Sequence, residues 1–293
     1  MVLIAGPWVS SAIGNQFNLV AGTLANGIDK GSWETDGTGG GDGSLTDADI
    51  VDPVHGMAFA VYSADDHSLM FYKRKGLPKV GDMLNSRRVT AVYTGFEENS
   101  YNGSVNWHQS EFPHINNGDT NTPWYEFHED IIKVEVVDFG IRPTNMGFWF
   151  QRFYALKILN IDKFDMSRNT SWQHTFWMCK SLDDLDLSRL NVNGFYAIES
   201  MCAVCTNLKT LNLRSWKGTT GCINLLVARC PNLTTLNLGD IDISNCGSFE
   251  QMFYGCSNLK YDCSDWNVSA SALHDNFNVN ASGVIAPTVW TAK

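Results

Sequence analysis

The chain has 293 residues, of which 44% are hydrophobic, so it is long enough to bury a sizeable core. Acidic residues outnumber basic ones by 31 to 21, the net charge is −10, and no basic run occurs, which argues against nucleic acid and anionic membranes as partners. No apolar run reaches about 18 residues, so we expect no membrane insertion.

The first segment, residues 1–52, predicts an extension followed by a glycine-rich linker. Residues 1–34 are weakly apolar without a clear period, and they could mediate homo-oligomer formation or form a loosely packed extension. The amino terminus lacks the basic region of a signal peptide. Export would therefore need a leader not included in this sequence, a non-classical route, or release within a virus particle.

Part of the linker resembles a calcium-binding loop. The stretch from Asp42 to Asp49 is similar to the second half of such a loop, but Thr38 and Gly40 occupy the positions of the first oxygen ligands. We therefore expect neither a metal nor a cofactor.

Residues 53–130 predict a small, mainly β domain with a long loop. Alternating apolar residues over 57–62 and 69–73, on either side of a polar turn, indicate a hairpin, and a third strand follows over 88–95. The loop over 97–123 has no period and carries Tyr101 and Trp107, with Trp124 just beyond it. Such a loop is either an ordinary packed connection or an element whose rings contact a glycan or protein.

From residue 131 to 274 the sequence indicates a solenoid, opened by a cap strand over 131–136 and closed by a cap over 275–293. One apolar pattern recurs at intervals of 26, 26, 25 and 26 residues. Its fixed points are Phe153, Cys179, Cys205, Cys230 and Cys256, and a leucine follows each of them three residues later, at Leu156, Leu182, Leu208, Leu233 and Leu259. A repeat of this length cannot bury its apolar face alone and must stack on copies of itself.

Each repeat predicts one short strand and one helical turn. The leucine spacing ends in an alternating pair, such as Leu211 and Leu213, that suits a strand with two residues facing inward. Before each leucine, apolar residues lie three apart, as in Phe176 and Cys179, which suits a helical or 3₁₀ turn behind the sheet. The predicted fold class is therefore α/β, a leucine-rich-repeat solenoid whose short parallel strands stack in an arc with helical turns behind.

These repeats resemble the BspA-type leucine-rich repeats of bacterial surface proteins. The resemblance rests on the stretches from Met252 to Leu259 and from Cys179 to Ser188, and it covers about residues 131–270. Cys202 and Val227 stand where the family pattern has phenylalanine, and the last repeat is one residue short. The resemblance implies a non-enzymatic recognition or adhesion protein outside the cell.

The eight cysteines all lie between Cys179 and Cys263, and six of them occupy apolar positions of the repeat, where we expect small buried fillers. Cys202 and Cys205 have the spacing of zinc ligands, but no second pair accompanies them, so we expect no metal. Cys222 and Cys246 lie off the pattern on neighbouring repeats, and a disulfide between them remains open.

Evidence for catalysis is weak. His108, His114, His128 and His174 lie near carboxylates in the sequence, but no nucleophile elbow, phosphate-binding glycine loop or metal triad occurs. We therefore expect a protein that is not an enzyme, with glycan hydrolysis as a minor alternative.

The predicted binding surface combines the outward residues of the strands with the aromatic loop. These candidate ligand-binding residues are Asp162, Asp186, Asn212, Arg214 and Asn237 on the strands, and Tyr101, Trp107 and Trp124 in and beside the loop. The alternative is a ladder of asparagine and aspartate side chains that bond to one another and only support the solenoid.

We expect the ligand to be a cell-surface protein or glycan, and the location to be extracellular or at the cell surface. The alternative is a virion component, such as a phage tail or fibre tip that binds a host receptor.

Overall fold

The computed structural model describes residues 52–97 and 122–291, which belong to one compact unit. It begins with the predicted hairpin, in which β1 (Met57–Ser63) pairs antiparallel with β2 (Ser68–Arg74). The third strand, β5 (Ala91–Thr94), pairs with the other edge of β1. A short hairpin of β3 (Met83–Leu84) and β4 (Arg87–Arg88) precedes it.

Both faces of the hairpin are buried. Alternate residues such as Ala60 and Phe71 belong to the main core, and their neighbours belong to a second, smaller cluster. The buried members of that cluster are Phe59, Val61, Met70, Tyr72, Leu84 and Val89. Burial on both sides explains why the polar residues of β1 and β2 are confined to the strand ends.

The hairpin sheet continues into the solenoid. β6 (Lys133–Val136), the predicted cap strand, pairs in parallel with β2 on one side and with β7 (Ile158–Asn160) on the other. The strand order is therefore β5-β1-β2-β6-β7, and one apolar core extends without interruption from Ala58 to Val284. The domain boundaries given by the sequence remain predictions.

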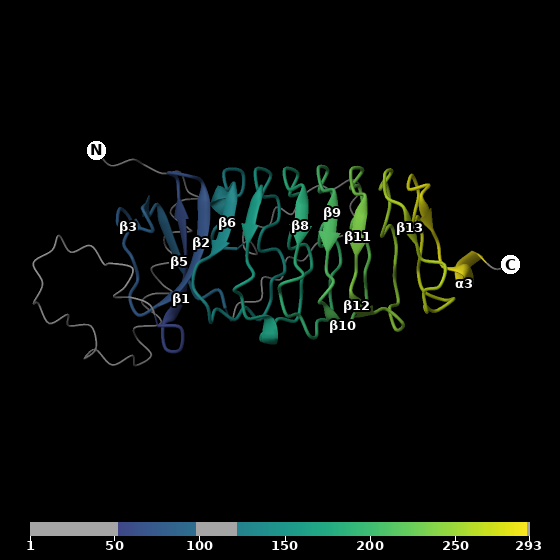
Figure 1. Ribbon diagram of the computed structural model, residues 1–293, viewed down its shortest axis with the longest axis horizontal. Coiled ribbons are helices and arrows are strands. Elements are labelled where there is room, and N and C mark those ends of the chain that lie inside the picture. The colour runs from purple at the N-terminus through teal and green to yellow at the C-terminus, as the bar shows by residue number, and fades with distance from the viewer. Residues whose placement is uncertain (1–51, 98–121, 292–293) are drawn as a thin grey trace, which may run out of the picture. The chain divides into compact units, whose positions relative to one another are not determined.

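The remaining coils stack their strands in one row (Figure 1). β8 (Asp184–Asp186), β9 (Thr210–Asn212) and β11 (Thr235–Asn237) form a parallel sheet in which Leu185, Leu211 and Leu236 lie side by side. All three leucines are buried, which confirms the predicted ladder at its centre. At its ends Leu159 and Tyr261 are half-buried.

The stack includes one more coil than the predicted repeats. β13 (Tyr261–Asp262) pairs in parallel with β14 (Val284–Ile285), so a sixth strand lies within the segment expected to be the closing cap. The short helix α3 (Thr288–Thr291) follows, and the Trp290 ring packs against Phe249 and Phe277. No helix in the described ranges is both long enough and apolar enough to cross a membrane.

A second row of parallel pairs runs along another edge of the coils. β10 (Lys217–Thr219) pairs with β12 (Asp240–Asp242), and both are visible away from the main row in Figure 1. A single bridge from Asn193 to Lys217 extends this row, and a further row of single bridges runs from Ser171 to Ala197, Cys222, Ser248 and Leu273. Each coil is thus bonded to its neighbours at more than one edge.

The predicted helical turns behind the strands are wrong. The helical elements of the described residues are α3 and two 3₁₀ turns, η2 (Tyr125–Phe127) and η3 (Met166–Arg168), so the solenoid is built from strands and turns. A helix would use its N–H groups within itself. Here the N–H groups of Phe150 and Phe176 donate to carbonyl oxygens of the following coil, those of Thr175 and Met201, at 3.0 and 2.9 Å.

These turns, which we call the turn row, place two residues with a left-handed backbone conformation (positive φ) in each coil, four positions apart. The pairs are Phe148/Arg152, His174/Met178, Ser200/Val204, Leu225/Arg229, Gln251/Gly255 and Asn276/Asn280. A residue other than glycine rarely adopts this conformation, least of all a β-branched one such as Val204, whose φ is 63°. Bonds from both neighbouring coils hold it, since the Val204 N–H donates to the Ala228 carbonyl at 2.7 Å and the Ala203 carbonyl accepts from the Met178 N–H at 2.9 Å.

One position of the turn row contains a buried histidine. His174 is 1% exposed, and its ring stacks on that of Phe148, the equivalent residue one coil earlier, with centroids 4.9 Å apart. Burial lowers the pKa of His174 to about 3, so the ring is neutral in the folded protein near pH 7.

We expect the Leu211→Asp substitution to prevent folding. Leu211 lies between Leu185 and Leu236 and is fully buried, so the substitution would place an unpaired carboxylate in the core at a cost of several kcal/mol, about 3 or more. Thr235→Asp is the matched control, because Thr235 is exposed in the adjacent strand. Thermal unfolding monitored by circular dichroism would measure both, and an unchanged melting temperature for Leu211→Asp would contradict the register.

We also expect His174 to make the protein acid-sensitive. Its folded pKa lies below the ordinary value of about 6.5, so below that pH the unfolded chain binds a proton that the folded protein does not. Stability from this group is complete above pH 6.5 and falls as the pH drops toward 3, by up to about 1.4 kcal/mol per pH unit.

The His174→Phe variant, which carries the residue found at Phe148, should have a shallower fall in the free energy of unfolding over this acid range. Urea titrations at several pH values would measure it. Identical slopes for the variant and the wild type would rule out this role for His174.

Candidate functional site

The candidate site is the outward face of the stacked strands, which we call the strand face. Its central column contains Asp186, Asn212 and Asn237, which the strand register places opposite one another. Asp186 and Asn237 are exposed, and Asn212 is half-buried. The structure therefore brings three of the predicted residues together.

The oxygen atoms of this column bond to the turn that follows each strand. Oδ1 of Asp186 accepts from the N–H of Ser188 at 3.0 Å, and Oδ1 of Asn212 and of Asn237 accept from the N–H of Arg214 and of Gly239 at 3.2 and 2.9 Å. Asn212 also donates from Nδ2 to Asp186 Oδ1 at 3.0 Å. The side chains of this column therefore close the turns at the ends of the strands, and the bond from Asn212 to Asp186 links two neighbouring coils, as the ladder alternative predicts.

The same bonds make Asp186 more acidic. Hydrogen bonds from Ser188, followed in importance by the bond from Asn212, lower the pKa of the Asp186 carboxyl below its usual range. This side chain is therefore a fixed negative charge on the strand face.

The two predicted residues beside this column, Asp162 and Arg214, carry opposite charges. Asp162 is exposed and lies 3.7 Å from the guanidinium of Arg189, also exposed, one coil further on. The exposed Arg214 side chain forms no ion pair with any residue in the described ranges. Arg214 therefore offers unpaired donors in the middle of the strand face.

The aromatic part of the predicted site is only partly described. Tyr101 and Trp107 lie outside the described residues. Trp124 is in the core: it is 0% exposed, its ring packs edge-on against Trp149 at 5.1 Å, and its Nε1–H donates to the Trp149 carbonyl at 2.8 Å. The expectation that Trp124 contacts a ligand is therefore wrong. Its ring is fully buried and its N–H is already hydrogen-bonded, so it offers no surface to a ligand.

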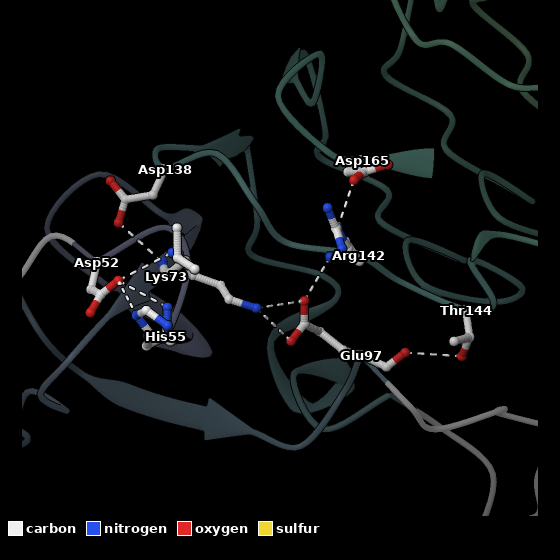
Figure 2. A network of polar contacts seen from close by, with 9 residues as sticks. Asp52, His55, Lys73, Glu97, Asp138, Arg142, Thr144 and Asp165 are labelled. Atoms are coloured by element: carbon white, nitrogen blue, oxygen red, sulfur yellow. Dashed lines mark hydrogen bonds and ion pairs between the residues drawn. The ribbon is translucent and has the colours of Figure 1, made fainter. Parts of the chain in front are cut away.

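A polar network fixes the chain at the start of the loop, as Figure 2 shows. The Glu97 carboxylate accepts from Lys73 Nζ at 3.2 Å and from the Arg142 N–H at 2.6 Å, and the Glu97 carbonyl accepts from the Thr144 N–H at 3.0 Å. Arg142 in turn donates to Asp165 at 2.7 Å. Glu97 and Trp124, on either side of the loop, are thus both fixed against the first coil.

A cluster of rings and charges beside Trp124 was not predicted from the sequence. It contains Tyr125, His128 and Tyr154, with Arg152 and Lys180 at its edges. The contributing segments are distant in the sequence, and only the stacking of coils brings them together. The one signal was the period, which places Lys180 one repeat after Tyr154.

Among the described carboxyl groups with a shifted pKa, Glu199 is the one whose pKa is raised, and burial is the main cause. Its carboxylate accepts from Gln173 Nε2 at 3.0 Å, and an amide cannot act as an acid–base partner.

The cysteines at the repeat position are buried, as predicted, and each forms an equivalent hydrogen bond. The thiols of Cys179, Cys205 and Cys256 each donate to a carbonyl oxygen of the preceding coil, at 3.1, 3.0 and 3.0 Å, and Cys230 does the same at 3.1 Å. A thiol is small enough for this space and supplies a weak hydrogen-bond donor, which alanine lacks. This explains why these positions hold cysteine rather than alanine.

All eight cysteines are free thiols in this structure, so Cys222 and Cys246 are not joined. Burial raises the pKa of Cys222 to about 11 and that of Cys256 to about 12. In the described ranges, no group of three or more histidine, cysteine or acidic side chains is arranged to hold a metal ion.

Two stretches of the chain, residues 144–221 and 221–283, are similar to a protein family described as "Mycoplasma protein of unknown function, DUF285". Together they extend from just before Phe148, the first residue of the turn row, to the residue before β14. No curated protein and no solved structure matches the chain. The match supports a repeat architecture, whereas the finer assignment to BspA-type repeats stays a prediction.

The burial of the thiols predicts how fast they react. Cys179, Cys205, Cys230 and Cys256 are buried with raised pKa values, so they should react with a thiol reagent at neutral pH only after unfolding. Cys222 is half-buried and should react first. Mass spectrometry of the labelled native protein would identify the sites. Rapid native labelling of all eight thiols would contradict the core position of the cysteines.

Proposed function

We propose that this protein is a non-enzymatic recognition protein that binds a cell-surface protein or glycan through its strand face, outside the cell or at its surface. The observation that carries this proposal is the unpaired Arg214 side chain, which stands among fixed polar groups on a rigid row of strands. Charged side chains with open donors are typical anchors of recognition surfaces.

The rigidity of the strand face supports a binding role. The strands are in register, and side-chain bonds close the turns that follow Asp186, Asn212 and Asn237. A surface that is ordered before binding loses little conformational entropy when a partner docks. The strand face can therefore bind a partner without first reorganising.

The mixture of charges favours a partner that is itself mixed or polar. Asp162 and Asp186 are negative, Arg189 and Arg214 are positive, and a further pair, Lys209 and Asp183, lies 3.6 Å apart at the edge. Such a surface suits hydrogen bonds and paired charges more than burial of a large apolar area.

We expect Arg214→Ala to weaken partner binding by about 1 to 3 kcal/mol if Arg214 is an anchor of the interface. The partner would be identified by binding labelled protein to whole cells and to a glycan array, and the affinity would then be measured by calorimetry. Arg88→Ala is the matched control, because it removes the same charge from an exposed residue in β4, away from the solenoid strands.

Binding by Arg214→Ala at wild-type affinity, with the melting temperature unchanged, would show that the strand face is not the binding surface. A partner that loses affinity equally in both variants would indicate a response to net charge alone.

A further inference from the structure

Three aromatic rings pack together at the start of the solenoid, in a cluster that we call the aromatic ledge. The ring of Tyr125 stacks on that of His128 with centroids 4.2 Å apart and planes 2° apart. His128 in turn lies 5.9 Å from Tyr154, centroid to centroid. All three side chains are half-buried, so each keeps part of its surface in contact with solvent.

Two cations lie at the edges of the ledge. The exposed Lys180 has its Nζ 5.1 Å from the centroid of Tyr154, and Arg152 donates from Nη1 to the Tyr125 hydroxyl at 3.4 Å. The Arg152 guanidinium also lies over the buried Trp177 ring at 5.1 Å. Neither cation forms an ion pair with a residue of the described ranges, so both keep donors for another molecule.

The ledge also presents hydrogen-bond acceptors. His128 Nδ1 lies 2.7 Å from the Tyr125 carbonyl oxygen, which can only accept, so Nδ1 carries the proton and Nε2 is an acceptor. Burial lowers the pKa of His128 and keeps the ring neutral near pH 7. Glu129 is exposed, and its carboxylate lies 3.8 Å from Nε2.

From this geometry we propose that the aromatic ledge binds a neutral sugar of the pyranose type. The face of a pyranose ring is apolar and packs on aromatic rings, whereas its hydroxyl groups both donate and accept hydrogen bonds. The ledge combines these features: rings from Tyr125 and Tyr154, donors from Arg152 and Lys180, and acceptors from His128 and Glu129.

The charge of the ledge selects the class of sugar. Arg152 and Lys180 contribute two positive charges, and Glu129 and Asp130 beside His128 contribute two negative ones. An acidic sugar would be attracted to the cations but repelled by the carboxylates that lie close to them. A neutral sugar has no such cost, and its binding does not depend on salt.

The site uses no residue of the strand face and does not depend on its proposed role. The repeat supplies variants that should fold. Met178 occupies the position of Arg152 one coil further on with nearly the same φ, 63° against 60°, and Thr206 occupies the position of Tyr154 two coils further on. Arg152→Met and Tyr154→Thr therefore each introduce a residue that the solenoid already carries there.

The test is saturation-transfer NMR of the full chain with maltose, cellobiose and lactose, and with sialyllactose as the acidic comparison, at low and high salt. At least one neutral disaccharide should give a signal that is unchanged by salt. Tyr154→Thr should weaken its binding at least about tenfold, because it removes a stacking ring, and Arg152→Met should weaken it several-fold.

Tyr196→Thr is the matched control, because Tyr196 is a tyrosine elsewhere on the solenoid that is 63% exposed, and its loss should leave binding unchanged. Arg88→Ala, which removes an exposed arginine in β4 outside both proposed surfaces, should also leave sugar binding unchanged.

The proposal is overturned if no neutral disaccharide binds, or if Tyr154→Thr and Arg152→Met both bind like the wild type. Salt-sensitive binding of sialyllactose alone would overturn the neutral class.

Discussion

Hydrogen bonds between the backbones of successive coils are the interaction on which the rest of this structure depends. In the turn row, N–H groups at every second residue donate to the next coil, as from Phe150 to Thr175 and from Cys202 to Leu226. The strands add a second set, with Leu211 paired to Leu185 and Leu236. A single coil would leave all of these groups unpaired, so no coil can be stable without its neighbours.

This constraint explains side chains that sequence rules alone would reject. Left-handed residues such as Val204 and Leu225 persist because the bonds on both sides fix their backbone, and the strain is small beside the bonds that would be lost. The thiol of Cys205 fills the small space behind the turn and donates to a carbonyl of the preceding coil. Composition at these positions follows from inter-coil spacing rather than from a requirement for reactive cysteine.

The period and the leucine spacing were sufficient to predict the solenoid, its inward ladder around Leu211 and the buried cysteines, because each depends on residue type at a fixed interval. The turn row could not be distinguished from a helix, since apolar residues three apart suit both. The sixth coil was missed because Ala281 and Val284 replace the cysteine and leucine that mark the others. The sequence did not indicate that Trp124 is buried or that the aromatic ledge forms, because both depend on contacts between segments far apart in the sequence.

The two proposed surfaces use the coils in different ways. On the strand face, the oxygens of Asp186, Asn212 and Asn237 already accept bonds from their own turns, so this column mainly holds the surface in place. Specific contacts must then come from neighbours such as Arg214, whose donors are open. At the aromatic ledge the three rings are half-buried and keep part of their surface in solvent, and the stacking of coils brings them together. The repeat period therefore marks the strand face in full but marks only part of the aromatic ledge, because Tyr154 and Lys180 lie one repeat apart whereas Tyr125 and His128 precede the repeats.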